Sequence, residues 1–243
     1  LKIKPDFIIC MGDINESAIS QADKIEQQVN IPVVMVDGAL TKMDQTYEFT
    51  GKLLNLEEPA KVLGTYCRET VSEVQAKSKN IPEDKKVRVY YAEGVNGLET
   101  DPGGSRHTEV LDMVGGVNVA DVTAKGSRGL IQVSPEQVLA WNPDVILSWE
   151  SAYDNILTDS RWKAINAVRD KRVYAVPSGP FNWFDRPPSV NRILGLRWLG
   201  NLLYPEVYGC DTAKETREFY KKFYHYDLSD EELTFLLEDS GGK

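Results

Sequence analysis

The 243-residue chain is poor in the residues and motifs that most enzymes use. Its only cysteines are Cys10, Cys67 and Cys210, and its only histidines are His107 and His225. An odd, sparse cysteine count argues against a disulfide framework, and these positions show no metal-binding spacing. The HExxH, CxxC, GxSxG and P-loop motifs are absent. We therefore predict no catalytic residue, no metal site and no cofactor.

Positive charge and long apolar runs are also scarce. The chain has 28 Lys and Arg against 37 Asp and Glu, which gives a net charge of −9. Binding to a nucleic-acid backbone needs clustered Lys and Arg, so we predict no nucleic-acid partner. No apolar run reaches the ~18 residues of a membrane-spanning helix. The opening residues LKIKPDF show no signal peptide in this chain.

What the chain does contain is an alternation of strand and helix patterns. Residues 5–12 (PDFIICMG) and 31–38 (IPVVMVDG) are apolar runs typical of buried strands, and 13–30 has the apolar spacing of a helix. A strand, a helix and a strand of this length predict a parallel βαβ unit. A further strand is expected at 86–94. The segment 129–151 is expected to form a short strand, a helix capped by Ser134 and a buried strand at 144–148, and the segment 160–179 a helix and a strand at 172–176. Other helices are expected at 57–79, 105–116, 188–204, 211–223 and 229–238. The pattern predicts an α/β fold.

Two segments of the chain resemble each other. LKIKPDFIICMGD (1–13) aligns with LAWNPDVILSWES (139–151), and IPVVMVDGAL (31–40) aligns with KRVYAVPSGP (171–180). Each copy has a Pro-Asp pair, then a strand that ends at a polar turn. The repeat predicts two Rossmann-like lobes.

The lobes are expected on either side of the long helical pattern. We predict a reduced N-terminal lobe at 1–56, a connecting helix at 57–81 and a C-terminal α/β lobe at 82–243. The alternative is that the helix belongs to the core of one domain. The first copy has no strands before residue 1, so we expect a truncated first lobe. An exposed sheet edge invites pairing, which predicts a possible homodimer through this lobe.

Motifs along nearly the whole chain resemble those of the class III periplasmic binding proteins, the substrate-binding components of ABC importers. The quoted segments are KPDFII, VYYAEGVNGLETDPGGSRHTEVLDMVGGVNVA, IQVSPEQVLAWNPDVIL, RDKRVYAVP and RPPSVNRILGLRWLGNLLYPE. The resemblance implies two lobes joined by a long helix. The departure is at the start, where members of the family have an opening stretch that completes the first lobe.

The resemblance also implies a function and a location. The expected ligand is a metal complex, such as a ferric siderophore, haem or a corrinoid, or a metal oxyanion such as molybdate. The expected partner is an ABC permease at the membrane surface, and the expected location is extracytoplasmic, as a periplasmic protein or a membrane-anchored lipoprotein. We predict no enzyme activity. The alternatives are a shortened non-transport paralogue that self-associates and binds no ligand, and a chelatase-like enzyme, for which His107 is thin support.

Candidate ligand-binding residues follow from the expected strand ends. Ligands of open parallel sheets bind beyond the carboxyl ends of the strands. Aromatic side chains and arginines there suit a ligand with a bulky organic face and an anionic edge. The candidates at these ends are Tyr91, Glu93, Arg106, Trp149, Glu150, Phe181, Trp183, Phe184 and Arg186.

The stretch SGPFNWFDRPPS, residues 178–189, holds four of these candidates. Its prolines lack the amide donor that helices and central strands need, so it is predicted to be a loop. Each candidate has a plainer interpretation. Trp183 and Phe184 could cap the core of their own lobe, Arg186 could bond loop carbonyls, and the acids could be solvated. Arg128, in a basic turn, is expected at the surface.

Overall fold

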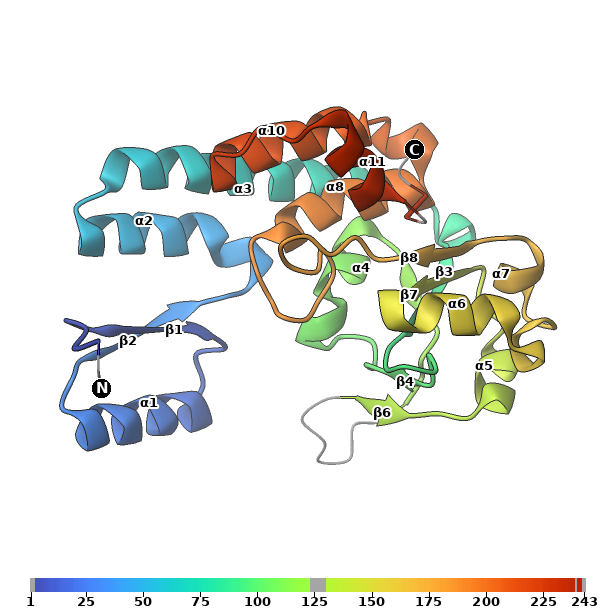
Figure 1. The fold of residues 1–243 in the computed structure, drawn as a ribbon, viewed down its shortest axis with the longest axis horizontal. Helices are drawn as coiled ribbons and strands as arrows, with labels where there is room; N and C mark the ends of the chain where they lie inside the picture. Colours follow the sequence, from blue (N-terminus) through green and yellow to red (C-terminus); the bar gives the residue numbers. More distant parts are fainter. Residues whose placement is uncertain (1–2, 123–129, 239, 242–243) are drawn as a thin grey trace. The chain divides into compact units, whose positions relative to one another are not determined.

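The computed structural model describes residues 3–122, 130–238 and 240–241, and Arg128 lies outside them (Figure 1). The α/β class predicted from the sequence is confirmed. The chain divides into two compact units, Leu1–Val71 and Ser72–Lys243. No helix among the described residues combines the length and the apolar character that crossing a membrane requires.

The first unit contains one βαβ motif. Strands β1 (Ile8–Gly12) and β2 (Val33–Asp37) pair in parallel and are joined by helix α1 (Glu16–Val29). The Asn15 side chain caps α1 by accepting a hydrogen bond from the Ala18 amide, which satisfies a donor that the first turn leaves open. This confirms the predicted parallel unit.

A helical hairpin follows in the same unit. After the short 3₁₀ helix η1 (Leu40–Lys42) come α2 (Met43–Leu54) and α3 (Glu57–Ser78). Helix α2 was not predicted. The two helices approach closely at Gly51, where an added Cβ would lie 2.4 Å from Cβ of Ala60. The predicted long helix is present as α3, which begins in the first unit and ends in the second.

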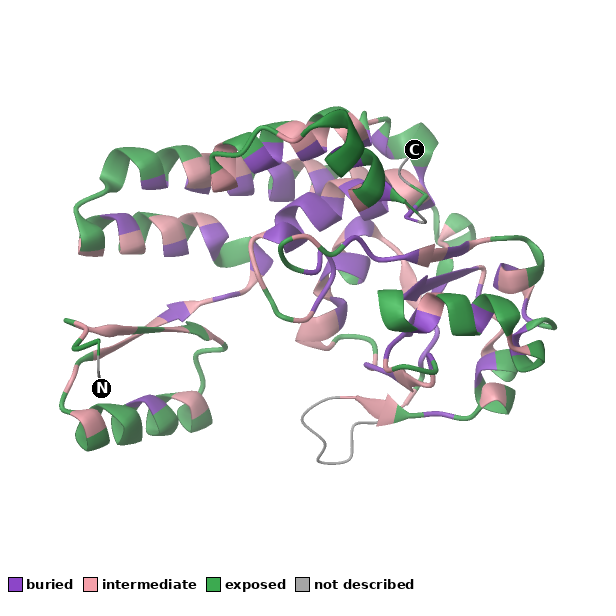
Figure 2. Ribbon diagram, in the orientation of Figure 1, coloured by how far each residue is buried: buried purple, intermediate pink, exposed green. Residues whose placement is uncertain are grey.

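The second unit is built on a four-stranded parallel sheet in the order β5-β3-β7-β8. These strands are β3 (Arg88–Ala92), β5 (Val117–Asn118), β7 (Val145–Ser148) and β8 (Val173–Ala175). The central strands β3 and β7 are buried along most of their length (Figure 2). Neighbours on both edges explain why their sequences are continuous apolar runs rather than alternating ones.

A separate two-stranded antiparallel pair joins β4 (Glu99–Thr100) to β6 (Ile131–Gln132). The short strand expected at the start of the segment 129–151 therefore lies outside the parallel sheet. The remaining helical segments of the unit are η2 (Glu83–Lys85), η3 (Arg106–Thr108), α4 (Glu109–Val114), α5 (Pro135–Trp141), α6 (Glu150–Thr158), η4 (Ser160–Trp162), α7 (Asn166–Arg169), α8 (Asn191–Leu203), α9 (Pro205–Tyr208), α10 (Thr212–Tyr224) and α11 (Asp230–Leu237). Helix α6, directly after β7, was not predicted.

Helix α8 is the most buried helix of the second unit, as the nearly continuous purple shows in Figure 2. It approaches the backbone of the loop that follows β8 at Gly195, where a Cβ would lie 1.8 Å from the Trp183 carbonyl oxygen. Only a residue without a side chain fits there. This contact holds the predicted loop, residues 178–189, against the core.

Candidate functional site

The candidate site lies where the carboxyl ends of β3 and β8 lead into loops of the second unit. Glu93 directly follows β3, and Arg186 belongs to the loop after β8. Within that loop, the Asn182 side chain accepts hydrogen bonds from the Phe184 and Asp185 amides. These bonds fix a turn that presents Asp185 and Arg186 side by side, so the sequence builds this part of the site locally.

Arg186 is surrounded by carboxyl groups from three separate stretches of chain. Its Nη1 donates to Glu93 Oε1 at 3.0 Å, Asp101 Oδ2 at 2.6 Å and Asp185 Oδ2 at 2.5 Å. The carboxyl side chains are 0%, 3% and 1% exposed, whereas that of Arg186 is 24% exposed. Burial opposes the charge of Arg186, but the acids outweigh it and raise the pKa of Arg186. Arg186 is therefore a fixed positive charge on a partly exposed side chain.

His107 joins the same cluster through Asp185. Its Nδ1 makes a short hydrogen bond with Asp185 Oδ1. Asp101, His107 and Asp185 each offer a ligand atom within 4.8 Å of the others, a spacing that a metal ion could use. However, Nη1 of Arg186 already lies between the two carboxylates. A cation would have to displace that positive charge, so the geometry favours Arg186 as the resident cation.

The acidity of Glu93 is strongly perturbed. Burial is the largest cause, and the charge of Asp101 adds to it, so the pKa of Glu93 rises to about 9 although Arg186 lowers it. A carboxyl group with this pKa is protonated at neutral pH. Arg186, which carries one positive charge, then faces the neutral acid Glu93 and the carboxyl groups of Asp101 and Asp185.

The predicted aromatic candidates lie mostly in the core. Tyr91, Trp183 and Phe184 are all 0% exposed. The ring centroids of Phe184 and Tyr91 lie 4.4 Å apart, and Trp183 packs edge-on against Trp198. These side chains are core residues in this structure rather than surfaces that a solute could touch. Strong apolar burial of aromatic rings is the physical reason.

Trp149 and Phe181 are more accessible. Trp149 is half-buried and donates from Nε1 to the Tyr91 hydroxyl at 2.7 Å. The Phe181 side chain is 42% exposed, while its carbonyl accepts a hydrogen bond from Asn191. A direct contact of either ring with a solute stays a prediction.

The structure does not bring all of the polar candidates together. Arg106 is half-buried in η3, one residue before His107. Glu150 is exposed at the start of α6 and lines a different hollow, of about 210 Å³, with Tyr153 and Phe235. Glu93 and Arg186, by contrast, are joined directly by a hydrogen bond.

Sequence reasoning missed Asp101 and Asp185 as members of the cluster. Asp185 precedes Arg186, and a buried acid beside an arginine in the stretch WFDRPP was an available signal. No sequence signal pointed to Asp101, because the position of Asp101 in the cluster depends on the connection through β4. The sequence pointed to His107 only as support for a chelatase-like enzyme.

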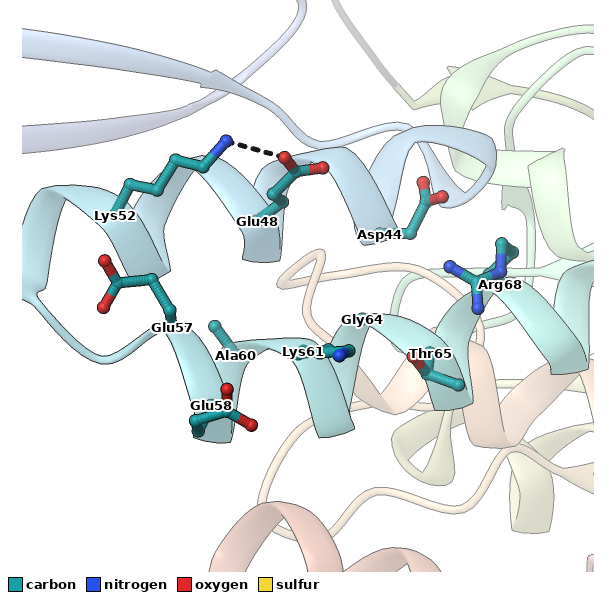
Figure 3. Close-up of a pocket in the computed structure, with 10 residues that line it drawn as sticks. All are labelled: Asp44, Glu48, Lys52, Glu57, Glu58, Ala60, Lys61, Gly64, Thr65 and Arg68. Atoms are coloured by element: carbon teal, nitrogen blue, oxygen red, sulfur yellow. Dashed lines mark hydrogen bonds and ion pairs between the residues drawn. The ribbon is translucent and has the colours of Figure 1, made fainter.

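A larger hollow lies in the first unit, between α2 and α3 (Figure 3). It measures about 400 Å³ and is lined by charges of both signs, including the ion pair of Lys52 with Glu48. The side chains in Figure 3 come from both helices, and none of the predicted ligand-binding residues is among them. Mixed exposed charges of this kind are ordinary helix-surface chemistry, so it is not the candidate site.

Comparison with known proteins identifies the class of protein to which the chain belongs. The family model for periplasmic binding proteins matches residues 1–180. The chain belongs to the periplasmic binding protein family, and the predicted fold class and the predicted importer-component class are both confirmed. The family consists of substrate-binding transport proteins, and its members act outside the cytoplasm.

Particular relatives narrow the comparison. The chain is 32% identical to the molybdate-binding protein MolA of Haemophilus influenzae, over 92% of this chain and 68% of that protein. It is 25% identical to the vitamin B12-binding protein of Vibrio campbellii, over 78% of this chain and 65% of that protein. The chain thus spans about two thirds of the length of these relatives.

A solved structure supports the fold over nearly the whole chain. An ABC transporter solute-binding protein from Sulfurospirillum deleyianum matches with a TM-score of 0.89 and 33% identity, covering 98% of this chain and 73% of that one. MolA bound to molybdate matches with a TM-score of 0.72 and 26% identity, covering 94% and 74%.

Proposed function

We propose that the chain binds a metal oxyanion of the molybdate type at Arg186 and delivers it to the permease of an ABC importer. The observation that carries this proposal is the Arg186 side chain, which is fixed by buried acids and yet is 24% exposed. Guanidinium groups bind tetrahedral oxyanions through paired N–H donors. The 32% sequence identity with a molybdate-binding protein supports the same ligand class.

Isothermal titration calorimetry tests the ligand class. Wild-type protein is titrated with sodium molybdate, sodium tungstate, vitamin B12, haem and a ferric siderophore. We expect molybdate and tungstate to bind. Binding of only an organic metal complex would contradict the oxyanion proposal and favour the broader metal-chelate prediction.

Replacement of Arg186 tests the site. Arg186→Ala removes a charge-assisted hydrogen-bond donor, so we expect molybdate affinity to fall by about 10- to 100-fold, roughly 1.5–3 kcal/mol. Arg161→Ala is the matched control, because Arg161 is an exposed arginine of the same unit that pairs with Asp159. Equal affinity of Arg186→Ala and wild type would remove Arg186 from the site.

Three finer expectations belong to the same proposal. No substrate turnover is expected, because the role of Arg186 is to bind and not to react. The protein is expected in the periplasm or on a membrane anchor, facing its permease. Formation of a homodimer through the first unit stays a prediction.

A further inference from the structure

The carboxyl groups around Arg186 compete for few hydrogens. A guanidinium Nη carries only a pair of N–H bonds, yet Glu93, Asp101 and Asp185 all lie within 3.0 Å of Nη1. The second Glu93 oxygen, Oε2, is buried and has no hydrogen-bond partner among the residues that the structure describes. A charged oxygen in that position is costly. A proton on Glu93 relieves the cost, because a neutral acid can donate to a neighbouring carboxylate.

The same crowding leaves the other edge of the guanidinium available. Within the described part of the chain, the hydrogen bonds of Arg186 to acids all involve Nη1. Nε and Nη2 form the edge through which arginine binds an oxyanion with parallel hydrogen bonds. Fixing one nitrogen of a planar group orients the remaining edge, which lowers the ordering cost of binding.

We infer that Glu93 is a positioning residue for solute binding: it holds Nη1 of Arg186 and so leaves the Nε and Nη2 edge for an oxyanion. This inference rests on the proposed function, since it concerns the same arginine and the same ligand class. Glu93 does not touch the solute, because its side chain has no exposed surface.

Charge balance gives Glu93 a second reason to act as a neutral acid. A charged Glu93 would add a negative charge beside the bound anion and weaken the binding of that anion. Burial and Asp101 keep the pKa of Glu93 at about 9. The titratable and charged groups that face Glu93 are Tyr90 and Tyr91 of β3, Glu99 of β4, Asp101 after β4, and Asp185 and Arg186 of the loop after β8.

The test compares replacements that keep or remove the hydrogen bond. Glu93→Gln keeps an oxygen that accepts from Nη1 and an amide that donates where the acid proton was, whereas Glu93→Ala keeps neither. Glu99→Gln is the matched control: it removes an acid whose backbone pairs with Glu93. Molybdate affinity is measured by calorimetry at pH 7.5 and 9.5, and the melting temperature without molybdate monitors folding.

Positioning by Glu93 predicts four results. Glu93→Ala lowers molybdate affinity at pH 7.5 by about tenfold or more, and Glu93→Gln stays within about threefold of wild type. Glu99→Gln leaves affinity unchanged. Raising the pH to 9.5 weakens wild type more than Glu93→Gln, which a purely structural role would not produce.

Other outcomes overturn the inference and separate it from the proposed function. If Glu93→Ala binds like wild type while Arg186→Ala does not, the positioning role is wrong and the proposed function stands. If Glu93→Ala is too unstable to assay, the pH dependence of Glu93→Gln decides, and parallel behaviour with wild type overturns the inference. If wild type binds neither molybdate nor tungstate, both proposals fail.

Discussion

At the scale of single residues, Glu93 shows how position alters chemistry. An ordinary glutamate is charged at neutral pH, but burial beside Asp101 raises the pKa of Glu93 to about 9. In the unfolded chain, Glu93 loses its proton at its ordinary pKa of 4.5. In the folded protein, Glu93 keeps this proton to a much higher pH. The contribution of Glu93 to the free energy of unfolding is fully present below the pKa that Glu93 has in the unfolded chain. It is lost as the pH rises toward the pKa that Glu93 has in the folded protein.

This linkage predicts a pH-dependent difference between wild type and Glu93→Gln. Glutamine does not titrate, so between about pH 5 and 9 the variant gains stability relative to wild type, by at most about 1.4 kcal/mol per pH unit. Urea unfolding at pH 5.5, 7 and 8.5 measures the change. A constant difference across this range would show that Glu93 is already ionised in the folded protein.

At the scale of elements, helix α8 and the loop after β8 depend on each other. The helix approaches the loop backbone at Gly195, and the Trp183 side chain, held by the same loop, packs against Trp198 of α8. The loop in turn supplies Asp185 and Arg186 to the site. Close backbone packing is thus what ties the residues of the candidate site to the core.

Gly195→Ala tests this contact. Alanine normally favours a helix over glycine by ~1 kcal/mol, but its Cβ would lie 1.8 Å from the Trp183 carbonyl oxygen. We expect destabilisation of roughly 1–3 kcal/mol by overpacking, with a changed tryptophan fluorescence spectrum. Gly12→Ala is the control, since nothing lies within 4 Å of a Cβ there. A variant as stable as wild type would mean that the loop moves away freely.

At the scale of the whole molecule, the two units differ in how well their sheets are covered. The side chains of Ile9 and Met11 on β1 are 41% and 54% exposed, whereas every residue of β7 is buried. In the described residues β1 pairs only with β2, and a sheet of two strands is marginally stable by itself. The first unit therefore depends less on strand burial than the second.

Hydrogen exchange should report this difference. We expect the β1 amides, Ile8–Gly12, to exchange at least about tenfold faster than the β3 and β7 amides, because opening a two-stranded sheet exposes little buried surface. Strand β8 is the internal control, because in the described residues it is an edge strand of the covered sheet. Mass spectrometry of peptic peptides measures the rates. Equal protection of β1 and β7 would contradict this ranking.

The sequence by itself determined much of the local structure and the family of this protein. Apolar runs and helical spacing predicted the β1–β2 and β7–β8 pairs, and both are parallel pairs, as the internal repeat implied. Prolines predicted the loop at 178–189. These features depend on neighbours in the chain, and periodicity records them directly.

Only the tertiary structure decided which residues form the candidate site. Strand order places β3 beside β7 and β7 beside β8, and the β4 connection returns Asp101 to Glu93 and Arg186. The same packing put Trp183 and Phe184 in the core and left Glu150 at another hollow. Strand order and burial are contacts between residues far apart in sequence, and no local pattern encodes them.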